Sequence, residues 1–590
     1  MGLGILEPKN REKVPGTTRY YDDPSRPQAA TAESDQAGLK VDNSGKVPII
    51  LTPQPSDDPN DPLNWPLWKR DLVTAILSWA GILATSLGPI LAPNTVRLKN
   101  AVAPTLDMSI VLTGYLLAGA GAAVIFFVPS GRVWGKRHLF ILGLCIVIGS
   151  SAWAGAIDSN DYPPPSPSTL NARYKSMAWA RAVQGIGIAP YESLLNAAVG
   201  DMYFVHQRGI RMAFTNLAVF GSAFFTPIVV GKITQALGVG WTFNFVAIFS
   251  AATLPFVIMF CPETAFRREN RYNTDVYTEE DVLHQQPASS DSSQTNEKES
   301  GGGFRLLPTN RRQHVGNANT PKKTFVESMS LFDGTKTDDP YLTLLLRPFP
   351  FLANPAFLWA CLIQGTMIAW TIFLGALVSA IFIGPPYWLG EVVSGYAYTG
   401  AFVGALGGFA VSGVLADTTA KWFTKLNGGV YEPEMRMFLI IPMLITGGIG
   451  MFGFALTVEE VAADKYTFIV PLVFFGFEVA GMVIGAVASS LYIVDAYRDI
   501  AIEGFTLTII FKNFFSFLVT FYALEWLIEG GITHVLTIIS IVQIGICLLT
   551  VPMYIYGKRC RAFFHRHDLI AICRLKELDN KIRGLFGGRR

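Results

Sequence analysis

Polar and charged side chains interrupt a long apolar segment, residues 174–200. They are Arg181, Gln184, Glu192 and Asn196. In an α-helix, at ~100° per residue, Arg181 and Glu192 lie within about 20° of one face and about 16 Å apart along the axis. Gln184 lies on nearly the same stripe. Because a charge at membrane depth is costly and usually marks function, we expect this face to look into the protein or into a water-filled cavity.

A second apolar segment, residues 466–494, carries one carboxyl group near its middle. Glu478 lies among Phe474, Phe475 and Phe477. An apolar setting favours the protonated form of a carboxyl group, so Glu478 is a candidate to exchange protons near neutral pH. The alternative is a permanently neutral Glu478 that hydrogen-bonds to a neighbouring helix.

The next apolar segment, residues 500–526, carries Glu503, Lys512 and Asn513. Glu503 is close to one end, where we expect its side chain to snorkel toward water. Lys512 is deeper and needs a partner, so a structural ion pair is the expected use.

Two further apolar segments have uncharged centres. Trp79 and Ser86 share a face of residues 70–93, and Gln364 and Thr371 share a face of residues 354–383, seven residues apart in each pair. Aromatic and hydroxyl faces would suit an amphipathic organic solute. As single residues they are equally consistent with helix packing.

These side chains must be positioned by membrane helices. Half of the 590 residues are hydrophobic and only 16% are charged, against about 25% charged in a typical soluble domain. Lipid cannot hydrogen-bond an exposed backbone, so an all-α integral membrane fold is predicted. Twelve spans can be marked at roughly 70–93, 108–130, 138–157, 174–200, 211–236, 241–261, 354–383, 391–416, 435–457, 466–494, 500–526 and 533–556.

The spans divide the chain into two halves of six. We expect a cytoplasmic, disordered N-terminal segment (1–69), a six-helix half (70–262), a polar, disordered central loop (263–353), a second six-helix half (354–556) and a basic tail (557–590). Lys and Arg concentrate in the short loops on the side of the termini, so both termini should be cytoplasmic in a multi-pass protein of the cell membrane. Residues 1–61 contain no cleavable signal peptide.

The sequence lacks the motifs of other functional classes. It has no phosphate-binding loop, no H-E-x-x-H and no Cys or His cluster with metal spacing, and its six cysteines suggest no disulfide framework. A net charge of +2 argues against nucleic-acid binding. We therefore expect no cofactor, no metal and no enzyme, and transport energy would come from a gradient.

Short motifs resemble those of the major facilitator superfamily, and in particular its fungal twelve-span drug:proton antiporter-like branch, which includes polyamine and cation uptake members. After the second span, Gly131, Gly135, Lys136 and Arg137 match a loop motif, although Arg132 stands where the family has an acid. The second half repeats part of that motif with Gly413 and Asp417. Arg181, Gln184 and Gly185 match a motif of proton-coupled members, and Pro227 and Gly231 match part of an antiporter motif. Asp61–Trp65 and Glu432–Arg436 also look fungal.

The resemblance implies two six-helix halves around a central cavity lined by spans 1, 4, 7 and 10. It implies a role in proton transfer for Arg181. From the buried charges themselves, we expect protons to bind at Glu478 or Glu192, helped by Arg181. Trp79, Ser86, Gln184, Asn196, Gln364, Thr371 and Glu478 would line the cavity.

The leading hypothesis is a secondary active transporter that exports a small drug-like compound or secondary metabolite in exchange for protons, acting as a monomer in the lipid bilayer. The alternative is a proton-coupled importer of an organic cation such as a polyamine. A membrane sensor without transport activity is a third hypothesis.

Overall fold

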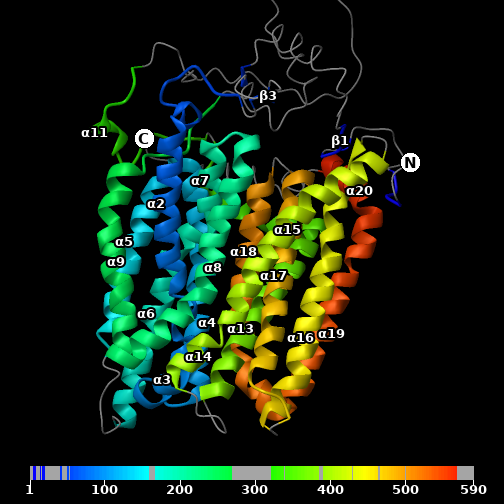
Figure 1. The fold of residues 1–590 in the computed structure, drawn as a ribbon. Helices are drawn as coiled ribbons and strands as arrows, with labels where there is room; N and C mark the ends of the chain where they lie inside the picture. Colours follow the sequence, from blue (N-terminus) through cyan, green and yellow to red (C-terminus); the bar gives the residue numbers. More distant parts are fainter. Residues whose placement is uncertain are drawn as a thin grey trace, which may run out of the picture.

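The computed structural model describes residues 4–7, 14, 16–19, 40–42, 49–51, 54–157, 166–268, 321–337, 339–383, 390–427, 430–462, 465–497 and 500–567 (Figure 1). Most of the N-terminal segment and of the central loop, for which disorder is predicted, lies outside the described residues. The end of the basic tail also lies outside them.

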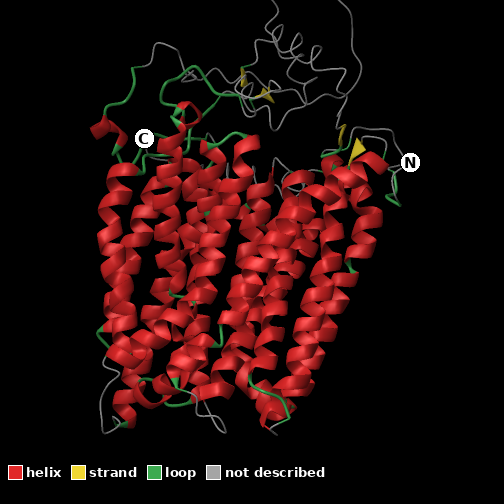
Figure 2. Cartoon of the chain, viewed as in Figure 1, coloured by secondary structure: helices red, strands yellow, loops and turns green. Residues whose placement is uncertain are grey.

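Long helices run side by side and make up nearly all of the described chain (Figure 2). Those of the first half are α2 (Leu67–Ser86) with η2 (Pro89–Asn94), α4 (Leu106–Trp134), α5 (Arg137–Gly155), α6 (Pro167–Ser193) with α7 (Leu195–Met202), α8 (Val205–Leu237) and α9 (Val239–Phe260). Those of the second half are α13 (Pro355–Ile383), α14 (Glu391–Tyr396) with α15 (Thr399–Leu426), η5 (Pro433–Leu439) with α16 (Ile440–Ala462), α17 (Ile469–Ala496), α18 (Ala501–Gly530), and α19 (Ile532–Leu548) with α20 (Thr550–Arg566).

Each of the twelve predicted spans coincides with a helix or a broken helix. Eleven helices of the described residues are long and apolar enough to cross a membrane. The remaining span is α6, whose polar residues reduce its hydropathy. It nevertheless packs between α4 and α5, with Arg181 fully buried. A polar helix is stable there because its neighbours, and not lipid, surround its polar side chains.

The two halves have separate hydrophobic cores. One cluster of buried side chains comes almost entirely from the first half, and the other almost entirely from the second. The halves meet where α4 packs on α18 and where α8 packs on α14 and α15. Small residues permit close approach, as at Gly231, where an added Cβ would lie 2.6 Å from the Glu391 carbonyl oxygen.

The bundle has two ends that differ in their short elements. One, here the α11 end, carries α11 (Phe325–Ser328), η5 and the end of α20, and the other, the α3 end, carries α3 (Thr95–Ala101) and α14 (Figure 1). Nearby short elements are η1 (Pro62–Asn64), α12 (Tyr341–Leu346) and η4 (Phe349–Ala353), with β2 (Val41–Asp42) paired to β3 (Ile49–Ile50).

The beginning of the chain docks on the second half. β1 (Thr18–Arg19) pairs antiparallel with β4 (Val430–Tyr431), and the Leu6 amide donates to the Ile555 carbonyl at 3.0 Å. Ile5 and Val14 are buried. α20 continues to Arg566, so the tail boundary predicted at residue 557 lies within a helix.

Candidate functional site

Glu478 is completely buried near the middle of α17. The Thr371 hydroxyl, on α13, lies 2.7 Å from Glu478 Oε1 and 2.9 Å from the Met367 carbonyl oxygen. Glu478 Oε2 has no hydrogen-bond partner among the described residues. Thr371 is the donor in both contacts, so its one hydroxyl proton is shared between Glu478 Oε1 and the Met367 carbonyl oxygen.

Glycines hold α17 against its two neighbours at this depth. A Cβ added to Gly450 of α16 would lie 2.2 Å from the Glu478 amide nitrogen, and one added to Gly404 of α15 would lie 2.0 Å from the Gly476 carbonyl oxygen. Larger side chains at these glycines would separate the helices. The glycine contacts therefore hold the Glu478 carboxyl group in the buried interior of the second half.

Arg181 is the buried cation of the first half. Its guanidinium donates to the carbonyls of Leu87 at 2.6 Å, Gly88 at 3.2 Å and Leu112 at 3.3 Å, and to Gln184 Oε1 at 2.9 Å. α2 ends at Ser86, so Leu87 and Gly88 follow its last turn. Carbonyls at a helix C-terminus carry partial negative charge. The break between α2 and η2 thus supplies a charge-compensating site without a carboxylate.

The other predicted cavity residues have different surroundings. Gln184 is buried beside Arg181, and Gln364 accepts from Ser489 at 3.5 Å. Asn196 is exposed and donates to Asn216 at 2.7 Å. Trp79 is 48% exposed, whereas Ser86 is buried and donates to the Leu83 carbonyl.

Glu192 joins the two halves. One of its carboxylate oxygens forms an ion pair with Lys512 of α18, and the other accepts from Asn513 at 3.1 Å. Lys512 Nζ also lies 5.8 Å from the centre of the Phe220 ring. The prediction that Lys512, deep in its helix, needs an ion-pair partner is therefore met by Glu192, which belongs to the other half.

A second connection between the halves lies nearer the α11 end. Arg132 Nη1 of α4 donates to Glu503 Oε1 of α18 at 2.5 Å. Arg347 Nε lies 3.0 Å from the same oxygen, without hydrogen-bonding geometry. The expectation that Glu503 snorkels is wrong. It is 2% exposed because the two arginines compensate its charge inside the protein.

The loop motif between α4 and α5 is held by one carboxylate. Gly135 has a φ of 95°, and an added Cβ would lie 2.2 Å from Glu263 Oε2, so only glycine fits. Glu263 accepts from the Lys136 amide at 2.9 Å and the Arg137 amide at 3.0 Å. Lys136 forms an ion pair with Asp201.

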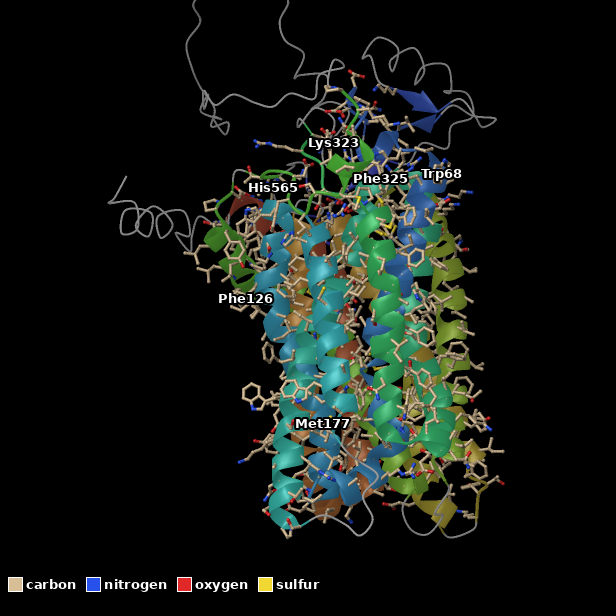
Figure 3. All side chains as sticks on the ribbon, turned by 90° about the vertical axis from the view of Figure 1, so that its left-hand side faces the viewer. Trp68, Phe126, Met177, Lys323, Phe325 and His565 are labelled. Carbon is tan, nitrogen blue, oxygen red and sulfur yellow. The ribbon has the colours of Figure 1, made fainter. Side chains whose placement is uncertain are left out.

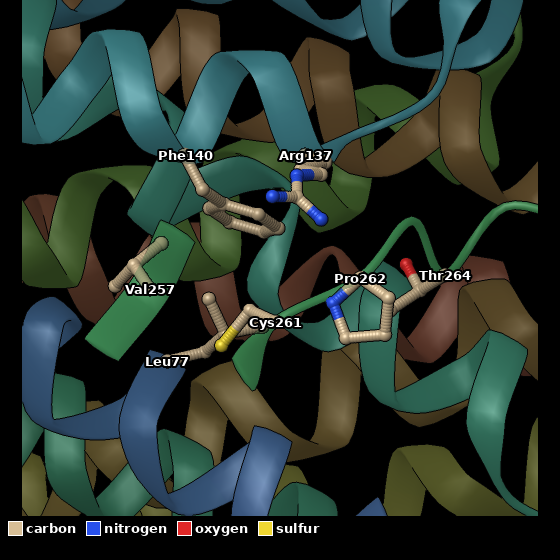
Figure 4. Close-up of a pocket in the computed structure, with 7 residues that line it drawn as sticks. All are labelled: Leu77, Arg137, Phe140, Val257, Cys261, Pro262 and Thr264. Atoms are coloured by element: carbon tan, nitrogen blue, oxygen red, sulfur yellow. The ribbon is translucent and has the colours of Figure 1, made fainter. Parts of the chain in front are cut away.

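Other motif residues occupy tight helix contacts. Arg137 lies in a narrow crevice beside Phe140 and Cys261 (Figure 4) and donates to the Ile258 carbonyl at 2.6 Å. An added Cβ would lie 3.2 Å from Leu194 at Gly131 and 2.0 Å from the Leu116 carbonyl oxygen at Gly185.

The antiporter-like motif lies on the contact between the halves at the α3 end. A Cβ added to Gly395 of α14 would lie 2.5 Å from the Pro227 carbonyl oxygen, close to Gly231. Arg97 Nη1 lies 3.7 Å from Glu391 Oε1 nearby. Gly413 and Asp417, by contrast, are on the exposed side of α15, and among the described residues no side chain forms an ion pair with Asp417.

Several residues of these connections were not predicted as site residues. Arg97, Arg347 and Glu391 lie outside or at the ends of apolar segments, where charges are ordinary, and Gly450 is one of many helix glycines. No group of three or more His, Cys, Asp or Glu side chains able to hold a metal occurs among the described residues.

Two six-helix halves joined at several depths, each with a buried ionisable group, define a multi-span membrane transporter. The sequence model of the Major Facilitator Superfamily matches residues 74–501, and the chain belongs to that family. It is therefore a transporter of the major facilitator type, of the fungal branch.

Similar proteins cover almost the whole chain. Protein HOL1 of Saccharomyces cerevisiae is 23% identical over 95% of this chain and 97% of its own length. The efflux pump radE of Floropilus chiversii is 22% identical over 90% of this chain and 88% of its own length. The xylose transporter XylE from E. coli, in a partially occluded inward-open conformation, matches 82% of this chain and 98% of its own with a TM-score of 0.52 and 13% identity, which supports the fold alone.

Proposed function

We propose that the protein couples the movement of a small organic compound to protons by alternating access, and that it exports this compound. The observation that carries the proposal is the Thr371–Glu478 contact. A buried carboxylate without a cation is strongly disfavoured, so Glu478 would release its proton only when a conformational change brings it water or a cation. That requirement links proton movement to the conformational cycle.

Arg181 and Glu192 contribute in different ways under this proposal. Arg181 holds a permanent positive charge against the broken end of α2, so rearrangement at the Leu87–Gly88 break would change its contacts. Glu192 is held by Lys512. Protonation of Glu192 would remove that attraction and loosen the halves at this depth.

Alternating access would use the charged contacts at the two ends of the bundle. Arg132–Glu503 and Arg347–Glu503 would close the α11 end, and Arg97–Glu391 would close the α3 end. Rocking of one half against the other breaks one set at a time. The solute would bind between the halves, near Gln364, Thr371, Gln184, Asn196, Trp79 and Ser86.

Export is supported by likeness to the radE efflux pump. The Lys and Arg bias of the loops supports a cytoplasmic α11 end, with both termini on that side. We further propose that the protein is a monomeric carrier of the cell membrane and not an enzyme.

A second candidate is import of an organic cation, such as a polyamine. One observation favours it. Glu192, Asn513 and the Phe220 ring already surround an alkylammonium group, that of Lys512. An ammonium group of a solute could replace it at the same carboxylate.

The test is transport in proteoliposomes with an imposed pH gradient. Gradient-driven export of a drug-like compound supports the first proposal, and uptake of a polyamine supports the second. Glu478→Gln keeps the shape of the side chain but cannot exchange a proton, so it should abolish the dependence on the gradient while solute exchange at equal pH continues. Glu460→Gln, at a surface carboxyl paired with Lys465, is the matched control. Full gradient dependence in Glu478→Gln would refute the role of Glu478.

A further inference from the structure

An exposed apolar patch lies at the α11 end. Within eight residues, Phe325 is 55% exposed, Val326 76%, Leu331 48% and Phe332 58%. Four large apolar side chains so close together are unusual on a surface that faces only water. Some occupant should therefore cover them.

The protein holds this segment mainly through its backbone. Arg137 Nη1 donates to the Ser328 carbonyl at 2.5 Å, and the Lys336 amide donates to the Val133 carbonyl at 2.8 Å. The Lys323 amide donates to Asn60 at 2.9 Å. Thr324 and Glu327 cap the short helix reciprocally. The polar groups of the segment are thus satisfied. Phe332 packs on the ring of His138 of α5, with 5.0 Å between the ring centres, while Phe325, Val326 and Leu331 remain exposed.

Lysines adjoin the apolar patch. Lys322 and Lys323 directly precede the capping Thr324, and both are exposed. Lys69, in the first turn of α2, is close enough to Lys322 for their charges to repel each other. Lys323 Nζ forms an ion pair with Asp333 Oδ1 at 2.6 Å. The neighbouring ammonium groups of Lys69 and Lys322 suit anionic phosphates.

The height of the patch matches a membrane surface. Lys323 and Phe325 lie at the same end of the bundle as Trp68 (Figure 3), which is 68% exposed at the start of a membrane-spanning helix. Exposed tryptophans at such positions mark the boundary between lipid tails and headgroups. α11 lies at the outer edge of the bundle, beyond α5 and α9 (Figure 1).

We propose that residues 322–332 form a membrane-surface anchor, in which Phe325, Val326, Leu331 and Phe332 enter the boundary of the surrounding bilayer and the lysines bind anionic lipid headgroups. Apolar side chains beside a basic cluster are the pattern of interfacial anchors. The anchor would fix the segment that leads to Arg347, and hence to Glu503, against the bilayer.

The experiment places a nitroxide label at Val326→Cys in the full chain, in lipid nanodiscs with and without phosphatidylserine. Thr335→Cys, an exposed polar position nearby, is the matched control. The unsubstituted chain, labelled in parallel, gives the background of its own cysteines. Collision with oxygen reports lipid, and collision with an aqueous nickel chelate reports water.

We expect the Val326→Cys label to favour oxygen over nickel several-fold more than the Thr335→Cys label. Phosphatidylserine should increase the difference, and Lys322→Gln with Lys323→Gln should remove that increase. A Val326→Cys label as accessible to nickel as the Thr335→Cys label, in both lipid compositions, would overturn the proposal and leave the patch to a protein partner. A phosphatidylserine-dependent increase that persists in the Lys322→Gln, Lys323→Gln variant would overturn the part that concerns anionic headgroups.

Discussion

Arg132 and Glu503 are 371 positions apart in the sequence, and their side chains meet at 2.5 Å across the two halves. The position of Arg132 is acidic in the related loop motif. Glu503 is in the first turn of α18, where a negative charge is favourable because helix N-termini carry partial positive charge. An arginine facing that turn would be repelled without Glu503. The basic residue at the motif position thus has an acidic partner in the other half of this chain.

This arrangement predicts a strongly non-additive effect of two substitutions. Arg132→Gln or Arg347→Gln leaves Glu503 one cation, so each should cost about 1 kcal/mol of unfolding free energy, whereas both together should cost about 3–5 kcal/mol by leaving a buried carboxylate unpaired. Thermal unfolding in detergent of the unsubstituted protein, the two single variants and the double variant measures this non-additivity. Lys465→Gln, at an exposed pair, should have no measurable effect. Additive losses would show that Glu503 does not depend on the two arginines jointly.

The glycine contact at Glu478 predicts a difference between neighbouring positions of α16. Gly450→Ala places a methyl group 2.2 Å from a backbone atom of α17 and should destabilise by about 1–3 kcal/mol. Gly448→Ala meets nothing within 4 Å and should be neutral or stabilising by up to about 1 kcal/mol. Melting temperatures of the two variants decide this, and equal values would contradict the close helix contact.

The Glu192–Lys512 pair predicts rescue by a second substitution. Glu192→Gln alone leaves a nearly buried ammonium group without a carboxylate and should cost about 3 kcal/mol. Adding Lys512→Met removes that unpaired charge and should recover part of the stability. A double variant that unfolds at or below the temperature of Glu192→Gln would show that the charge of Lys512 is satisfied elsewhere.

Asp61 predicts a pH-dependent contribution to stability. Burial alone would raise the pKa of Asp61, but the hydrogen bonds and charge of Arg268, with the Leu63 and Ser56 amides, hold it below the usual 3.8. The ionised form is therefore the stabilising one. Its contribution is complete above about pH 4 and disappears as the pH falls through the lower folded value.

Asp61→Asn should accordingly cost about 3 kcal/mol, equally at pH 8 and pH 5, because it leaves Arg268 without its carboxylate. The cost should shrink only below the usual pKa of 3.8. Asp57→Asn, at an exposed pair with Lys40, should change the melting temperature little. A cost of Asp61→Asn that already differs between pH 8 and pH 5 would contradict this ionisation state.

The helices themselves could be predicted from hydropathy, and their ends less well. The span predicted at 108–130 is α4, Leu106–Trp134, and that at 211–236 is α8, Val205–Leu237. Both helices run beyond the apolar stretch because hydropathy detects the lipid-crossing part, whereas helices continue into the polar region. Disorder was predicted for the whole N-terminal segment, but the described Ile5 and Val14 are buried against the bundle.

The partners of the site residues could not be predicted. Periodicity places Arg181 and Glu192 on one stripe, but Arg181 contacts a helix end within its own half and Glu192 contacts the other half. Trp79 and Ser86 share a face by spacing, yet one is half exposed and the other buried because two helical turns separate their surroundings. A single sequence indicates which side of a helix a residue lies on, but it does not show which residues of other helices contact that side.

The pairing of β1 with β4 has a consequence for biosynthesis. Thr18 is made early, and its partner Tyr431 follows more than 400 positions later. At about 5–20 residues per second, the first strand would wait about 20–80 s at the ribosome for its complement. During that interval the first strand must not pair with any other strand. A bulky fusion before Met1 should therefore impair maturation of the second half more than the same fusion after Arg590.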